Sequence, residues 1–99
     1  MNVLICFDTD GTLETSNGPV KTDRLRELER QGAKVVIVSP SSARPQGFVC
    51  INDLPSRLEC LQKASQTFPS EMKLYVSDNG DMDIAKQAGF IYIDRMLFV

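Results

Sequence analysis

The most informative absence in this 99-residue chain is histidine, which does not occur at any position. Without an imidazole, the sequence excludes histidine-ligated metal sites, Ser-His and Cys-His nucleophile pairs, and imidazole acid–base chemistry. Any catalysis must therefore use carboxylates, hydroxyls, cationic side chains and a hard metal ion.

Cysteines and long apolar runs are also scarce. Cys6, Cys50 and Cys60 form no C-x-x-C pair and are odd in number, so we interpret them as buried small hydrophobic residues and not as a disulfide framework. No segment approaches the ~20 apolar residues of a membrane span, and the N-terminal apolar run is too short for a signal peptide. We therefore expect a cytoplasmic protein with no membrane partner.

Neither sign of charge dominates the composition. The chain has 11 Lys and Arg against 13 Asp and Glu, a net charge of −2, so no bulk affinity for nucleic acid is expected. The length and the 42% hydrophobic content predict one globular domain over residues 1–99.

Five short apolar runs alternate with helical patterns. The runs are continuous and not alternating, which is typical of parallel strands covered on both faces. The predicted strands are Val3–Phe7, Val35–Val38, Phe48–Ile51, Leu74–Val76 and Phe90–Ile93, and the predicted helices are Asp23–Gln31, Pro55–Thr67 and Met82–Ala88. This order predicts an α/β fold: a doubly wound, mainly parallel five-stranded sheet with helices on both faces, Rossmann-like, with no cap domain. The apolar Met96–Val99 segment predicts either a short strand closing the core or a patch that pairs with another subunit, so an oligomer is possible.

Polar side chains follow three of the predicted strands. Because ligands of open α/β sheets bind beyond the carboxyl ends of the strands, these side chains form the candidate site. Clustered carboxylates without histidine suit Mg²⁺, and a hydroxyl with backbone amides suits phosphoryl oxygens. The candidates are Asp8 and Asp10 after the first strand, Ser39 after the second, and Ser77, Asp78, Asn79 and Asp81 after the fourth.

The run Asp8-Thr9-Asp10-Gly11-Thr12-Leu13, directly after an apolar strand, resembles the first motif of the haloacid dehalogenase-like hydrolase superfamily. Val35–Ser39 resembles the second motif of that family, Leu74–Asp81 resembles its acidic fourth motif, and Ala85–Phe90 resembles the helix and strand that follow. The resemblance implies a Mg²⁺-dependent phosphomonoester hydrolase in which Asp8 is the nucleophile and Asp10 the general acid/base. The implied metal residues are Asp8, Asp10, Asp78 and Asp81, and the implied substrate-binding residues are Thr9, Ser39, Arg57 and Asn79.

The chain departs from the family pattern at the third motif, which is usually a lysine. Alignment on Pro55 puts Leu54 at that position, so Arg57 is the nearest replacement cation, with Lys63 and Arg44 as alternatives. The three-residue step from Asp78 to Asp81 is also short for the family, which favours Asp78 as the metal ligand; Asp81 is also placed to cap the next helix.

The short connections leave no room for a cap domain, and Glu14–Pro19 is the only candidate lid. An open site fits a bulky phosphorylated substrate, such as the end of a macromolecule, or a small one enclosed by oligomerisation. Two other functions fit the same residues. One is a metal- and phosphate-binding regulatory domain without turnover, and the other is a receiver-like domain that accepts phosphate on Asp53.

Overall fold

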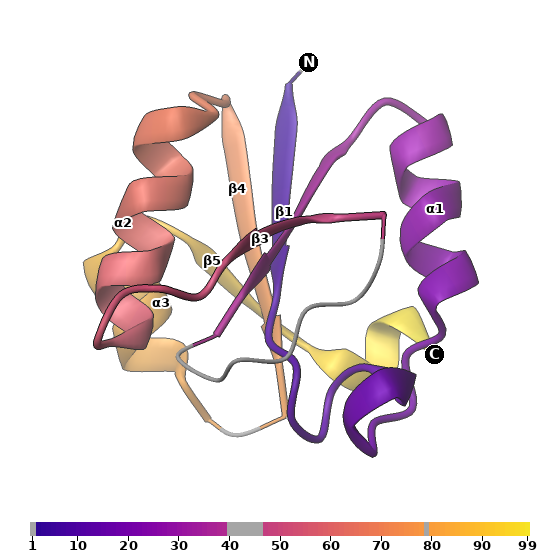
Figure 1. Ribbon diagram of the computed structural model, residues 1–99. Helices are drawn as coiled ribbons and strands as arrows, with labels where there is room; N and C mark the ends of the chain where they lie inside the picture. Colours follow the sequence, from indigo (N-terminus) through magenta and orange to yellow (C-terminus); the bar gives the residue numbers. More distant parts are fainter. Residues whose placement is uncertain (1, 40–46, 79) are drawn as a thin grey trace.

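A computed structural model describes residues 2–39, 47–78 and 80–99 of the chain. Its centre is a five-stranded sheet in the order β3-β2-β1-β4-β5, and every pair of neighbouring strands is parallel (Figure 1). The strands are β1 (Val3–Phe7), β2 (Lys34–Val38), β3 (Val49–Ile51), β4 (Met72–Ser77) and β5 (Ile91–Asp94). The predicted α/β architecture is confirmed, and the described residues contain no cap domain.

Helices cover both faces of the sheet. In Figure 1, α1 lies on one side of the strands, and α2 and α3 lie on the other. The α-helices are α1 (Thr22–Arg30), α2 (Arg57–Thr67) and α3 (Met82–Gln87), and two short 3-10 helices are η1 (Glu14–Ser16) and η2 (Arg95–Phe98). The predicted boundaries of the strands and α-helices lie within two residues of these positions.

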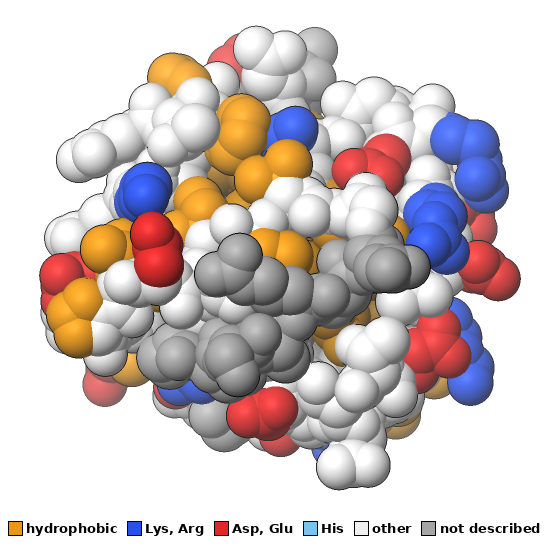
Figure 2. Space-filling view, viewed as in Figure 1, with side chains coloured by type: hydrophobic (Ala, Val, Ile, Leu, Met, Phe, Trp, Pro, Cys, Tyr) orange, Lys and Arg blue, Asp and Glu red, His pale blue; other side chains and the backbone are white. Residues whose placement is uncertain are grey.

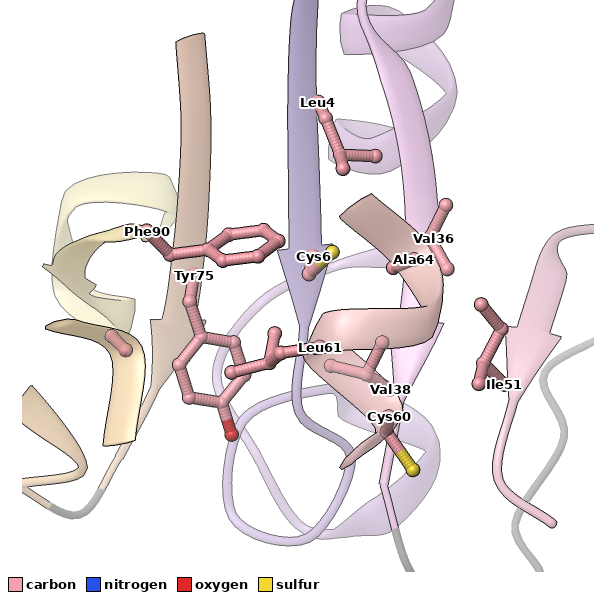
Figure 3. Close-up of a cluster of buried hydrophobic side chains, with 11 residues drawn as sticks. Leu4, Cys6, Val36, Val38, Ile51, Cys60, Leu61, Ala64, Tyr75 and Phe90 are labelled. Carbon is pink, nitrogen blue, oxygen red and sulfur yellow. The ribbon is translucent and has the colours of Figure 1, made fainter. Parts of the chain in front are cut away.

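Each face of the sheet has its own hydrophobic core, because successive side chains of a strand point to opposite faces. On the α2 side, Leu61 and Ala64 pack with Cys6 of β1 and Tyr75 of β4 (Figure 3). The core on the α1 side contains Leu25 and Leu28 of α1 with Ile5, Phe7, Val35 and Ile37 of the strands. Strand β1 lies between the two cores and is buried from Leu4 to Phe7, which fixes the position of whatever follows it.

Charged side chains of both signs are interspersed over the α1 side of the face shown in Figure 2, as the small net charge suggests. Helix α1 begins at Thr22, not after it, and the Glu14 carboxylate accepts hydrogen bonds from the Thr22 amide (2.7 Å) and hydroxyl (2.9 Å). The Glu14 side chain therefore accepts from the first amide of α1, which has no acceptor within the helix.

Of the two alternatives for the C-terminal apolar residues, the short strand is wrong, because these residues form a 3-10 helix. Residues Arg95–Phe98 form the 3-10 helix η2, whose first turn is capped by Asp94 through a 2.8 Å bond from the Met96 amide. Phe98 packs against the core on the α1 side, whereas Met96, Leu97 and Val99 are exposed. Of the cysteines, Cys6 and Cys60 are buried as expected and Cys50 is half-buried.

No helix among the described residues is long and apolar enough to cross a membrane.

Candidate functional site

Asp8 is a buried carboxylate at the carboxyl end of the central strand. Its amide donates to the Val76 carbonyl (2.9 Å), so the residue continues the pairing of β1 with β4, and only 1% of its surface is exposed. Burial raises the pKa of the Asp8 carboxyl, and the nearby charges of Asp78 and Asp81 add to this rise. The Arg57 guanidinium and a hydrogen bond from the Thr9 amide act in the opposite direction and favour the ionised form.

Arg57 is the cation that contacts Asp8 and Asp81 among the described residues. Its Nη2 lies 3.5 Å from both carboxylate oxygens of Asp8, and its Nη1 lies 3.3 Å from Oδ2 of Asp81. Arg57 is the first residue of α2, and that helix starts there because the Ser56 hydroxyl caps it by accepting from the Glu59 amide (3.2 Å). The start of α2 therefore places the Arg57 guanidinium beside the carboxyl end of β1.

Asp81 is held by a set of donors from β4. Its Oδ2 accepts from the Ser77 hydroxyl at 3.2 Å and lies 3.5 Å from the Tyr75 hydroxyl, which points toward the carboxyl end of the strand in Figure 3. Tyr75 and Ser77 are two residues apart, so both side chains leave β4 on the same face. Asp81 occupies the N-cap position of α3 without a side-chain capping bond, and its carboxylate faces Arg57 instead.

A hydrogen bond between Thr9 and Ser39 connects the carboxyl ends of β1 and β2. The Thr9 hydroxyl donates to the Ser39 hydroxyl (3.1 Å), and both residues are buried, with 0% and 2% of their surfaces exposed. The Ser39 amide donates to the Ile51 carbonyl of β3 (3.3 Å), which extends the sheet beyond β2. These two predicted substrate-binding residues are thus brought together at the same edge as Asp8.

Gly11 allows the chain after Asp8 to pass close to Asp78. Its φ of +74° is in the left-handed region, and a Cβ at this position would lie 2.1 Å from Oδ2 of Asp78. Asp78 therefore lies directly against the turn that follows Asp10. Both Asp10 and Asp78 are exposed to solvent, in contrast to Asp8.

Two of the alternative residues lie away from this cluster. Lys63, one candidate for the missing lysine, is on the same helix as Arg57 but forms a 3.9 Å ion pair with Asp53. Asp53 follows the edge strand β3, which β2 separates from β1, and its side chain is 62% exposed. The predicted site residue Asn79 and the alternative cation Arg44 lie outside the described residues.

Tyr75 and Arg95 were not among the predicted site residues. Tyr75 reads as a core residue of an apolar strand, and only its two-residue spacing from Ser77 indicates that its hydroxyl reaches the site. Arg95 donates through Nη1 to the Gly11 carbonyl, a contact across 84 positions of sequence that no local pattern predicts. The position of Arg57 did have a local signal, because Ser56 and Glu59 form the S-x-x-E pattern of a capping box.

The carboxylates of the described residues form no cage of protein ligands for a metal ion, so a Mg²⁺ ion held by them would keep most of its water. Within the part of the chain that the structure describes, no three Asp, Glu or Cys side chains form a metal cluster. Mg²⁺ commonly takes only one or two carboxylates and completes its shell with water and phosphate oxygens. Among the described residues, the charges that act most strongly on Asp8 are the Arg57 guanidinium and the carboxylates of Asp78 and Asp81, so a divalent cation would offset an excess of negative charge there.

The chain matches no protein-family profile, no curated protein and no solved structure.

Proposed function

We propose that this chain is a Mg²⁺-dependent phosphomonoester hydrolase whose nucleophile is Asp8. The observation that carries the proposal is the pairing of a buried carboxylate with a guanidinium at the carboxyl edge of a parallel sheet. The Nε of Arg57 is buried, and it has no hydrogen-bond partner among residues 2–39, 47–78 and 80–99. Although Nε itself is buried, 22% of the Arg57 side chain is exposed, so the guanidinium can contact a phosphoryl oxygen.

The proposed reaction has two displacement steps. An oxygen of Asp8 attacks the phosphorus of a phosphomonoester, the bond to the leaving oxygen breaks, and Asp10 gives that oxygen its proton. Water then attacks the phosphorus of the aspartyl-phosphate, Asp10 accepts the proton of the water, and release of inorganic phosphate restores Asp8. The exposure of Asp10 suits this role, because the leaving group and the incoming water both reach it from solvent.

Arg57 takes the role of the family's third-motif lysine in this proposal. Its guanidinium lies between Asp8 and Asp81, where it lowers the energy of the ionised nucleophile and can contact the phosphoryl oxygens. Asp81, which Ser77 and Tyr75 hold in place, orients Arg57 and contributes little as a metal ligand. Asp8 and Asp78 would hold Mg²⁺, which when bound neutralises the phosphate charge that otherwise repels the nucleophile.

The substrate class follows from the open architecture. With no cap domain among the described residues, the site suits the phosphorylated end of a macromolecule, or a small phosphoester enclosed by a second subunit. The oligomeric state and the cytoplasmic location stay predictions.

The same fold without turnover, as a phosphate- and metal-binding regulatory domain, is the second candidate. The long 3.5 Å approach of Arg57 to Asp8 is the observation that favours it, because a weakly held cation stabilises a transition state less.

A hydrolysis assay tests the proposal and separates the two candidates. An aryl phosphate and a panel of natural phosphoesters are incubated with the protein, with and without Mg²⁺, beside Asp8→Asn. Turnover that needs both Mg²⁺ and Asp8 is the expected result. Turnover that survives Asp8→Asn contradicts the nucleophile assignment, and Mg²⁺ binding without any turnover supports the regulatory domain.

A further inference from the structure

The 3-10 helix η2 contacts the segment that carries the acidic pair at two points. The Nη1 of Arg95 donates to the carbonyl of Gly11, one residue after Asp10. The ring of Phe98 meets the ring of Phe7, one residue before Asp8, edge to face with centroids 5.4 Å apart. The two contacts therefore bracket the acidic pair from both sides in the sequence.

We propose that η2 holds the Asp8–Thr12 loop in its working geometry, and that Arg95 and Phe98 are positioning residues for Asp8 and Asp10. The catalytic consequence of this proposal rests on the proposed hydrolase function. The structural part of the proposal, that η2 restrains the loop, is independent of the hydrolase function.

Around Gly11 the loop is held by short-range backbone hydrogen bonds, whereas Asp8 and Thr9 before it are bonded to β4 and to Ser39. The Thr12 amide donates to the Thr9 carbonyl (3.0 Å), and the Gly11 amide donates to the Ser16 carbonyl (2.8 Å). Gly11 adds backbone freedom, and its Cα lies directly against the Asp78 carboxylate. A shift at Gly11 would change both the position of Asp10 and the distance from the loop to Asp78.

The other end of the restraint is fixed to the rest of the fold. Helix η2 follows β5 directly, and the Tyr92 hydroxyl of β5 donates to the Ser77 carbonyl of β4 (3.1 Å). Phe98 also lies under the Arg24 guanidinium of α1, 6.0 Å from the ring centroid. Helix η2 thus connects the loop to the sheet and to α1, so it can restrict the movement of Asp8 and Asp10.

Arg95→Met tests the hydrogen bond, because it keeps most of the aliphatic stem and removes the donor. We expect kcat to fall about 10- to 100-fold with KM changed less than about twofold, as for a small displacement of a reacting group. Amide exchange at Gly11 and Thr12 should be about five- to tenfold faster, as expected for the loss of one hydrogen bond. Arg95→Lys, which keeps a donor and the charge, should recover part of both effects.

Phe98→Leu tests the ring contact, and Leu97→Ala is the matched control on the same helix. Leu97 is 71% exposed, so its truncation should change neither kcat nor loop exchange. Phe98→Leu should lower kcat and make amide exchange at Asp8 faster. Both are measured well below the melting temperature of each variant, so that only folded protein contributes.

The outcomes separate the two claims. Unchanged loop exchange in both Arg95→Met and Phe98→Leu overturns the proposal, whatever the activity. Faster exchange with unchanged kcat overturns the role of Arg95 and Phe98 as positioning residues, since the restraint would then be purely structural. If the wild-type protein hydrolyses no phosphoester, the hydrolase function fails, and faster loop exchange still supports the restraint by η2.

Discussion

Removal of the Arg57 charge is the perturbation that reports most fully on the site. Arg57→Met keeps most of the aliphatic stem and removes the guanidinium that faces both Asp8 and Asp81. Loss of one preorganised donor to transition-state charge typically costs about 3–4 kcal/mol, so kcat should fall about 10²- to 10³-fold. Arg57→Lys should be intermediate, because an ammonium restores the charge but not the planar pair of donors.

The same substitution should lower the free energy of unfolding. The Asp8 side chain is only 2% exposed, and without Arg57 its ionised form loses its counter-charge. We expect a loss of about 1–3 kcal/mol at neutral pH, the range for a buried polar group that loses its partner. Burial already raises the pKa of Asp8 in the folded state, and losing Arg57 raises it further. The folded variant therefore binds protons more readily than the unfolded chain, so its deficit should shrink as the pH falls and Asp8 is protonated.

Urea titrations at neutral and acidic pH, together with kcat measured on an aryl phosphate, provide the assay. Lys63→Met is the matched control on the same helix, because Lys63 makes a 3.9 Å ion pair in which both side chains are about half exposed or more. That substitution should change stability by less than about 1 kcal/mol and leave kcat unchanged. Equal effects of the two substitutions on kcat would refute the assignment of Arg57 as the cation of the site.

Three further predictions concern the loop and the helix starts. Gly11→Ala should abolish turnover and lower the melting temperature, because its φ is +74° and the new Cβ would meet Asp78; calorimetry and the aryl phosphate assay check this. Glu14→Gln should lower stability at neutral pH but not in acid: hydrogen bonds from Thr22 lower the pKa of Glu14 in the folded state, so the wild type loses this contribution as the pH falls through that value. Stability curves of both proteins against pH measure it. Ser56→Ala should cost about 1 kcal/mol in a urea titration, the usual loss for an N-cap hydroxyl.

The strands could be predicted because continuous apolar runs are typical of strands that are buried on both faces. Strand β1 is buried on both faces from Leu4 to Phe7, so its end, and with it the position of Asp8, follows from the sequence alone. The predicted start of α2 was less accurate. Pro55 suggests a first helical turn, but the Ser56–Glu59 capping box starts the helix at Arg57, two residues later. The lysine position of the family that the sequence resembles falls on Leu54, whereas in space Arg57 faces Asp8.

Contacts between distant segments could not be predicted in this way. The Asp81 carboxylate reads in the sequence as a metal ligand or a helix cap, and its contact with Arg57 depends on how α2 and α3 pack on the sheet. Likewise, Arg95 reaches Gly11 only because β5 ends beside β4 and the chain then turns toward the α1 side. Periodicity and capping rules act over one or two turns, so they carry no information about such pairs.

Transfer of the phosphoryl group to Asp8 is tested most directly by peptide mapping after brief exposure to a small phosphodonor. The protein is incubated with acetyl phosphate and Mg²⁺, quenched in acid, and analysed by mass spectrometry beside Asp8→Asn and Asp53→Asn. We predict a phosphate on the peptide that contains Asp8, present in Asp53→Asn and absent in Asp8→Asn. Phosphate on Asp53, or turnover of a phosphoester that persists in Asp8→Asn, would contradict the account.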